Sequence, residues 1–230
     1  MIKGFRGTSL VDYPGKVASV IYTYGCNFRC PYCYNIELVL PEFYRELPDI
    51  SEEEVLDNLQ KRKGFVQGVV ITGGEPTLWE RKLHFLIERI HFEIGLPVKI
   101  DTNGSHPHLI KTLLEEELLD YVALDLKTSP QKYSQISGDF EKVKETLEIL
   151  KNYREKVEIR ITLYPPLVTE EDLEEMLSYL SGFKNIALQK YLPEKNLSGR
   201  PSPSYSEEEM ESLMGFLQKK LPEANFLRRF

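Results

Sequence analysis

Residues 18–33 read ASVIYTYGCNFRCPYC, an apolar, β-branched run followed directly by a cluster of cysteines. The first part of this stretch, Ala18–Thr23, predicts a buried β-strand. The second part places Cys26, Cys30 and Cys33 in one CxxxCxxC loop after that strand. The sequence therefore predicts a buried strand with a cysteine loop at its carboxyl end.

The same alternation of strand and helix patterns continues along the chain. The further predicted strands are Gly68–Thr72, Val98–Thr102, Tyr121–Leu126, Val157–Leu163 and Asn185–Lys190. The predicted helices are Glu52–Arg62, Glu80–Phe92, Pro107–Glu117, Phe140–Tyr153, Glu170–Leu180 and Glu207–Leu221. Six βα repeats with right-handed crossovers predict an α/β fold, a partial (β/α)6 TIM-like barrel of parallel strands with a C-terminal helix. A flat, doubly wound sheet is the alternative.

Three of these helices begin with a hydroxyl residue that precedes a run of acids, at Ser51, Thr169 and Ser206. We interpret these residues as helix caps, with the acids at the positive end of each helix dipole. No stretch resembles a linker between domains. We therefore expect a single domain over 1–230, with a lead-in at 1–17, the partial barrel at 18–190, and a C-terminal loop and helix at 191–230.

The composition is that of a soluble globular protein: 230 residues, 41% hydrophobic and 28% charged. A formal net charge of −7 leaves no basic stripe, so we expect no nucleic-acid partner. No apolar run approaches the roughly 20 residues of a membrane helix, and the N-terminus lacks a signal-peptide pattern. We therefore expect no membrane partner and a cytoplasmic location.

Three kinds of site can use the clustered cysteines. A structural zinc site needs a fourth ligand, and the four histidines lie on or beside predicted outer helices. A thiol redox site would use Cys30 and Cys33 but leaves Cys26 unexplained. A [4Fe–4S] cluster on three thiolates would keep one iron open for an exogenous ligand. The spacing and the preceding strand favour the iron–sulfur cluster.

CxxxCxxC after the first strand of a partial barrel resembles the radical SAM superfamily, over nearly the whole chain. The segment Ser9–Lys16 is similar to the lead-in of glycyl-radical-enzyme activases, including activating proteins of anaerobic ribonucleoside-triphosphate reductase. The resemblance implies a [4Fe–4S] cluster on the three cysteines and S-adenosylmethionine (SAM) on its open iron. It also implies reductive cleavage of SAM to a 5′-deoxyadenosyl radical, which installs a glycyl radical on a partner enzyme. An external electron donor such as flavodoxin or ferredoxin is implied as well.

The resemblance further assigns cofactor contacts to residues at the ends of the predicted strands. Gly73, Gly74 and Glu75 match the superfamily's GGE motif, which holds the methionine amino group. Asp101, Thr102, Asn103, Asp125 and Lys127 match activase segments that contact SAM, and the aspartates with Thr102 can hold a monovalent cation. Arg160 has a counterpart in the activases, although a structural ion pair explains it equally well. Tyr32 keeps the aromatic position inside the motif and can pack against adenine.

Two positions depart from the activase pattern. Tyr34 follows the third cysteine where close activases more often have histidine, and Leu192 lies where pyruvate formate-lyase activases carry a histidine. We expect Gln189 or Tyr191 to supply the lost adenosine contact. Two alternatives stay open at this point: a radical SAM enzyme acting on a small molecule, such as a 7-carboxy-7-deazaguanine synthase, and a non-catalytic iron–sulfur or zinc protein.

Overall fold

The computed structural model describes residues 1–194, 196–199 and 202–229. The chain forms two compact units. The first unit comprises Met1–Asn27, Asn35–Thr102 and His108–Val122. The second unit comprises Phe28–Tyr34, Asn103–Pro107 and Ala123–Phe230. The cysteine motif is thus shared, because Cys26 belongs to the first unit and the other two cysteines to the second.

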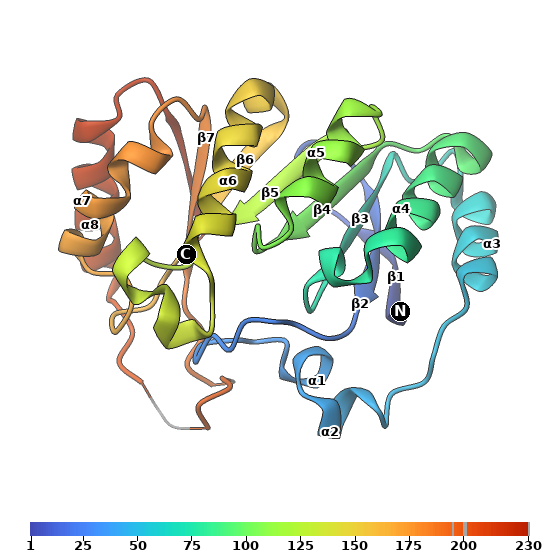
Figure 1. Ribbon diagram of the computed structural model, residues 1–230, viewed down its shortest axis with the longest axis horizontal. Helices are drawn as coiled ribbons and strands as arrows, with labels where there is room; N and C mark the ends of the chain where they lie inside the picture. Colours follow the sequence, from blue (N-terminus) through green and yellow to red (C-terminus); the bar gives the residue numbers. More distant parts are fainter. Residues whose placement is uncertain (195, 200–201, 230) are drawn as a thin grey trace. The chain divides into compact units, whose positions relative to one another are not determined.

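The first unit is built on four strands with helices that follow them in the chain (Figure 1). The strand β1 pairs antiparallel with β2, whereas β2, β3 and β4 are parallel neighbours. Its strands are β1 (Ile2–Ser9), β2 (Ala18–Thr23), β3 (Gly68–Gly73) and β4 (Val98–Thr102). Its helical segments are α1 (Ile36–Val39), α2 (Pro41–Tyr44), α3 (Glu52–Arg62), η1 (Pro76–Trp79), α4 (Glu80–Arg89), η2 (Ile90–Ile94) and most of α5 (Pro107–Glu115).

The second unit continues the alternation of strands and helices. Its last three strands pair in parallel, β6 with β7 and β7 with β8. The strands are β5 (Tyr121–Asp125), which begins in the first unit, β6 (Val157–Leu163), β7 (Asn185–Lys190) and β8 (Asn225–Arg229). The helical segments are η3 (Pro130–Ile136), α6 (Phe140–Leu150), η4 (Lys151–Lys156), α7 (Glu170–Leu180) and α8 (Glu207–Lys220).

The order of strands decides between the two predicted architectures. The sheet runs β1-β2-β3-β4-β5-β6-β7-β8, so strand order follows chain order throughout. A doubly wound sheet reverses direction at a switch point, whereas strands that succeed one another without reversal form the wall of a barrel. The predicted α/β fold of partial TIM-barrel type is therefore confirmed, and the doubly wound alternative is excluded.

The structure adds two edge strands that the sequence did not predict. The strand β1 contains Gly4 and Gly7 and pairs with β2 through two register irregularities, so no clean alternation marks it. The strand β8 has no fully buried residue and carries two arginines. Both strands flank the six predicted ones, which agree with the structure to within one residue at each end.

Three helical regions differ from the prediction. The helix expected over Glu80–Phe92 becomes a π-helix from Ile90 and ends at Gly95 with a left-handed backbone. The helix expected over Phe140–Tyr153 ends at Leu150, because Tyr153 in the following segment leaves the helical region. The stretch between Tyr34 and Ile50, for which no helix was predicted, contains the four-residue helices α1 and α2.

All three predicted helix caps are confirmed. The Ser51 side chain accepts a hydrogen bond from the backbone N–H of Glu54. Thr169 and Ser206 each form a full capping box, with Asp172 and Glu209 respectively. These contacts satisfy backbone donors that a helix start otherwise leaves without partners.

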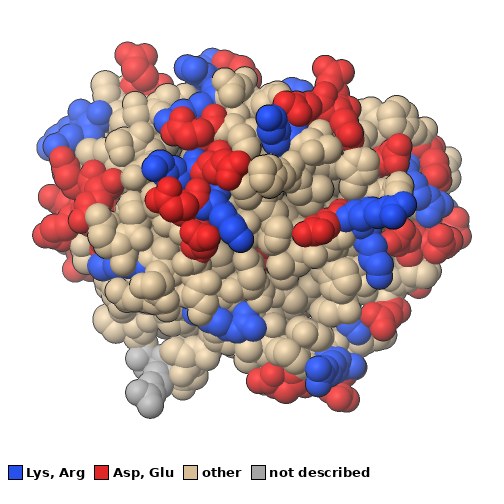
Figure 2. Space-filling model, in the orientation of Figure 1, with Lys and Arg blue, Asp and Glu red and all other residues tan. Residues whose placement is uncertain are grey.

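The surface agrees with the charge composition. On the face drawn in Figure 2, basic and acidic side chains are interspersed rather than gathered by sign. Among the described residues, no helix combines the length and the apolar character that crossing a membrane requires.

Candidate functional site

The start of the cysteine loop is fixed by backbone hydrogen bonds within the first unit. The Gly25 N–H donates to the Leu38 carbonyl at 2.7 Å, and the Gly25 carbonyl accepts from the Glu75 N–H, also at 2.7 Å. The Trp79 indole donates to the Tyr24 carbonyl at 2.9 Å. The segment immediately before Cys26 is therefore anchored to the end of β3.

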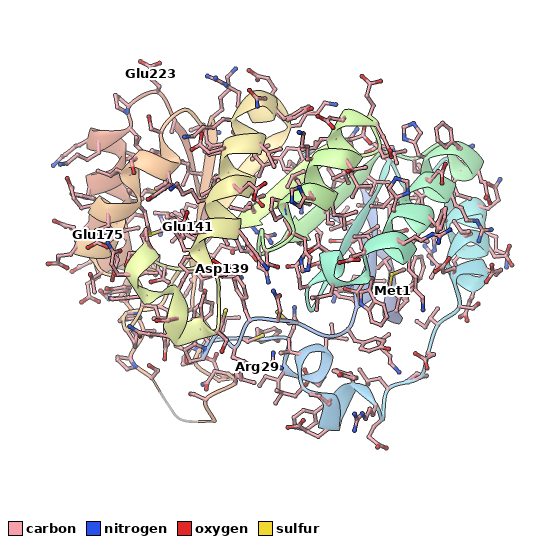
Figure 3. The ribbon with its side chains drawn as sticks, in the orientation of Figure 1. Met1, Arg29, Asp139, Glu141, Glu175 and Glu223 are labelled. Carbon is pink, nitrogen blue, oxygen red and sulfur yellow. The ribbon has the colours of Figure 1, made fainter. Side chains whose placement is uncertain are left out.

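The remainder of the loop is anchored within the second unit. The Arg29 N–H donates to the Ile136 carbonyl at 2.8 Å, and the Cys33 N–H donates to the Cys30 carbonyl at 3.0 Å. Arg29 is labelled in Figure 3, together with Asp139, which caps α6. Burial raises the pKa of the Cys30 thiol, and the positive charge of Lys127 opposes that shift.

All three cysteines are thiols. In the described part of the chain, no three His, Cys, Asp or Glu side chains gather around a point where one metal ion could sit. Soft thiolate donors are the ligands that iron–sulfur clusters take, and a cube of four irons gives each thiolate its own iron. The donor set therefore fits such a cluster in kind and number of cysteines.

Two glycines close the end of β3. At Gly74, a Cβ atom would lie 2.0 Å from the carbonyl oxygen of Gly25. At Gly73, where φ is +121°, a Cβ atom would lie 2.3 Å from the carbonyl oxygen of Thr23. The Gly73 carbonyl also accepts a hydrogen bond from the Asn35 side chain at 3.0 Å. Only glycine permits this close approach of three chain segments.

Glu75 carries a buried carboxylate, with 1% of the residue exposed. Its Oε1 accepts hydrogen bonds from the Thr77 N–H at 3.1 Å, the Thr77 hydroxyl at 2.6 Å and the Thr102 hydroxyl at 2.7 Å. The same carboxylate caps η1. The predicted motif residues Glu75 and Thr102 are thus brought together, and the carboxylate has both a structural role and a fixed position.

Asp101 has a partner that the sequence analysis did not identify. The ammonium group of Lys99 forms an ion pair with Asp101, and both side chains are at least nine-tenths buried. Lys99 and Asp101 are two residues apart on β4, so they point to the same face of the sheet. The two-residue spacing of Lys99 and Asp101 within the predicted strand Val98–Thr102 could have indicated this ion pair from the sequence.

The second unit holds a three-membered charge cluster. Asp125 pairs with Arg160 at 2.6 Å and with Lys127 at 2.9 Å. Burial alone would raise the pKa of the Asp125 carboxyl, but Arg160 and Lys127 together lower it well below its usual range. Burial disfavours charge on Lys127 as well, yet Asp125 raises the pKa of that ammonium above its usual value. The predicted anionic partner of Arg160 is therefore Asp125.

The backbone around this cluster is fixed by groups that the sequence analysis did not single out. The Tyr133 hydroxyl accepts a hydrogen bond from the Lys127 N–H at 3.2 Å. In the turn after β4, the side-chain oxygen of Asn103 accepts from the Ser105 N–H at 3.0 Å. Gly104 has a φ of +78°, so this turn also requires a glycine.

The remaining predicted cofactor residues lie in the second unit. Tyr32 is buried and its ring packs against Tyr164, with centroids 5.2 Å apart. Tyr34 is 55% exposed. Gln189 lies in register with Thr162 of the neighbouring strand. Tyr191 is buried, and its hydroxyl accepts a hydrogen bond from the Asn196 side chain at 3.2 Å. The assignment of these residues to a cofactor stays a prediction.

Comparisons with known proteins agree with this picture. Residues 20–180 match the model of the Radical SAM superfamily. A protein of Methanocaldococcus jannaschii named as a glycyl-radical enzyme activating enzyme is 34% identical over 99% of this chain and 89% of its own length. A pyruvate formate-lyase-activating enzyme of Clostridium pasteurianum is 28% identical over 84% of this chain and 81% of its own. A 7-carboxy-7-deazaguanine synthase of Thermococcus kodakarensis is 28% identical over 71% of this chain and 68% of its own length.

A likeness in fold accompanies the likeness in sequence. The crystal structure of Streptococcus suis SuiB bound to S-adenosylmethionine matches 91% of this chain with a TM-score of 0.64 and 18% identity. The chain covers about half of that protein, 49% of its length. The family implies a [4Fe–4S] cluster and SAM as cofactors, and the three thiols and the glycine-lined end of β3 fit them in kind. This chain is therefore an enzyme of the radical SAM superfamily, of the glycyl-radical-enzyme activating type.

Proposed function

We propose that this enzyme installs a glycyl radical on a partner protein such as anaerobic ribonucleoside-triphosphate reductase. The observation that carries the proposal is the 34% identity to the M. jannaschii activating enzyme, which extends over 99% of this chain. The match includes the Ser9–Lys16 segment, which lies outside the region of the superfamily model. The names of the relatives give the class of partner, a glycyl-radical enzyme. The choice of a ribonucleoside-triphosphate reductase within that class comes from the resemblance of the Ser9–Lys16 segment.

In this proposal Cys26, Cys30 and Cys33 ligate the cluster. The cluster and SAM held there would supply reductive radical chemistry, with the electron from an external donor and glycine Cα–H as the site of hydrogen-atom abstraction. The contribution of the chain is to bind, to orient and to exclude water. The paired backbone anchors of the cysteine loop, at Gly25 and Arg29, serve that purpose.

The end of β3 is the proposed receptor for the methionine ammonium group. Binding of a cation costs little side-chain conformational entropy when the buried carboxylate that binds it is already held by three hydrogen-bond donors. Glu75 meets this description through its contacts with Thr77 and Thr102. Gly73 and Gly74 support this receptor by letting the backbone at Thr23 and Gly25 pack closely against the end of β3.

The charge cluster of the second unit is the proposed receptor for negative charge. Lys127 and Arg160 share one carboxylate, Asp125, so the three groups keep a formal charge of +1. A net positive, partly buried group attracts the methionine carboxylate. The monovalent cation stays a prediction; Asp101 and Asp125 each pair with a cation of the chain itself.

The test is electron paramagnetic resonance of the reduced, reconstituted enzyme mixed with SAM and a candidate glycyl-radical protein from the same organism. A glycyl doublet that needs both SAM and the reductant is the expected result. The second candidate function is that of the T. kodakarensis relative, a 7-carboxy-7-deazaguanine synthase. Formation of 7-carboxy-7-deazaguanine, with no glycyl doublet on any partner, would replace the proposal with that activity.

A further inference from the structure

Lys99 is a buried lysine that lies outside the predicted site residues. The residue is 2% exposed and lies on β4, in register with Val70 of the neighbouring strand. Val70 belongs to an apolar cluster that also contains Tyr13, Ala18 and Val20. A charged group in such surroundings loses its hydration and needs a partner of opposite charge within the protein.

The partner of Lys99 is Asp101. Their side chains form a salt bridge in which the lysine is 2% and the aspartate 10% exposed. Among the described residues, Asp101 is the one acid with which this ammonium group forms a salt bridge. Removal of either partner would leave an uncompensated buried charge. The ammonium group of Lys99 is therefore dedicated to the Asp101 carboxylate.

The same carboxylate is one of the groups that the resemblance to the activases assigns to a monovalent cation, together with Thr102. A metal cation at Asp101 would add a second positive charge close to the Lys99 ammonium group, and like charges in a buried place repel each other strongly. The Thr102 hydroxyl, the other side chain of that set on β4, donates its proton to Glu75 at 2.7 Å. The arrangement in the first unit therefore fits a metal cation at Asp101 poorly.

We propose that the Lys99 ammonium group takes the place of a monovalent metal cation at Asp101, so that the enzyme binds SAM without an added metal cation. The proposal rests on the proposed role of Asp101 in the SAM site. A lysine ammonium group is compact and carries the same single charge as such an ion. Because it is attached to β4, it neutralises the Asp101 carboxylate without the cost of capturing an ion from solution. Lys99 acts through Asp101 and is therefore a positioning residue.

The predicted metal cation and this proposal require opposite responses to salt, so an exchange of salts distinguishes them. The experiment is titration calorimetry of SAM on the reconstituted enzyme in NaCl, KCl and choline chloride at equal ionic strength. Choline is too large to sit beside a buried carboxylate. The wild-type protein should bind SAM with the same affinity in all three salts.

Lys99→Met keeps a long side chain and removes its charge. Its affinity for SAM in choline chloride should fall by about tenfold, because the Asp101 carboxylate is left without a cation. Na⁺ or K⁺ should restore part of this affinity by taking the place of the ammonium group. Lys111→Met is the matched control, because it removes an exposed salt bridge with Glu115 on α5 and should bind SAM like wild type in every salt.

A second measurement separates this proposal from the proposed function, because it uses the cluster-free protein without SAM or a partner. The midpoint of urea unfolding of the wild-type protein should be the same in the three salts. The midpoint of Lys99→Met should be lower in choline chloride and should recover in NaCl or KCl. A merely structural role of the lysine would not produce this rescue.

Two results would overturn the proposal. One is a wild-type protein whose SAM affinity or stability rises when Na⁺ or K⁺ replaces choline, and this measurement needs no variant to fold. The other is a Lys99→Met protein whose SAM affinity and stability either match those of wild type or stay reduced in all three salts.

Discussion

The hydroxyl of Thr102, at the end of β4, donates a 2.7 Å hydrogen bond to Oε1 of Glu75, just beyond the end of β3. Two motifs that lie 27 residues apart in the sequence meet in this contact. Because β3 and β4 are parallel neighbours, their carboxyl ends lie at the same edge of the sheet. The contact ties the position of the proposed ammonium receptor to a second strand, and its removal has measurable consequences.

Thr102→Val keeps the shape of the side chain and removes the donor. We expect the free energy of unfolding to fall by about 1–3 kcal/mol, because a buried carboxylate loses one of its hydrogen bonds. Thr102→Ser retains a hydroxyl and should recover most of the loss. Chemical denaturation of the three proteins measures the effect, and equal stability of wild type and Thr102→Val would contradict the role of this hydrogen bond.

Glu75→Gln tests the carboxylate itself. The amide oxygen can still accept from the Thr77 and Thr102 hydroxyls, so the protein should fold. The loss of the negative charge should weaken SAM binding by roughly 10- to 100-fold, since hydrogen bonds to charged groups contribute ~1.5–3 kcal/mol. Titration calorimetry measures the affinity. Glu42→Gln, on the exposed α2 helix, is the matched control, and an equal affinity in both variants would exclude Glu75 as the receptor.

Asp125→Asn tests the charge cluster through its dependence on pH. The pKa of Asp125 is lower in the folded protein than in the unfolded chain, so the folded state binds fewer protons between the two values. The stabilisation is therefore complete above the unfolded pKa of about 4 and is lost as the pH falls below it. The free energy of unfolding of the wild-type protein should exceed that of the variant by about 3 kcal/mol at pH 7. This difference should become smaller as the pH falls toward 2. A difference in unfolding free energy that does not change with pH would show that packing, not charge, causes the lower stability of Asp125→Asn.

Gly74→Ala tests the close approach of chain segments beside the cysteine loop. A Cβ atom there would lie 2.0 Å from the Gly25 carbonyl oxygen, so the backbone must move. We expect a loss of several kcal/mol in stability, in the range typical of overpacked or strained sites. Gly215→Ala is the control, because that glycine lies within α8 with open space around it, and alanine there should stabilise by up to about 1 kcal/mol.

The sequence was sufficient to predict the parts of the fold that have a strong local pattern. The ends of buried β-branched strands such as Val157–Leu163 can be read from the sequence, and so can the ends of capped helices such as Glu170–Leu180. The strand β1 lacks such a pattern because glycines and charged residues interrupt it, and its pairing with β2 is irregular. The helices α1 and α2 span four residues each, too few to show a helical period.

For the candidate site, the sequence indicated residue types but not their partners. Glu75 and Thr102 were predicted separately, and only the register of β3 and β4 explains why they meet. Asn35 could not be predicted, because its contact with the Gly73 carbonyl depends on how the chain returns after the cysteine loop. Tyr32 was assigned to adenine from its aromatic ring, whereas the packing of that ring against Tyr164 became visible only in the structure.

The most direct test of the account is anaerobic reconstitution with iron and sulfide, followed by analysis of the metal content and by electron paramagnetic resonance with and without SAM. The wild-type protein should bind about four irons per chain, and SAM should change the spectrum of its reduced cluster. Cys26→Ala, Cys30→Ala and Cys33→Ala should each lose the cluster, while folding as judged by circular dichroism is retained. One zinc per chain with no iron-dependent absorbance, or a reduced spectrum that SAM leaves unchanged, would contradict the account.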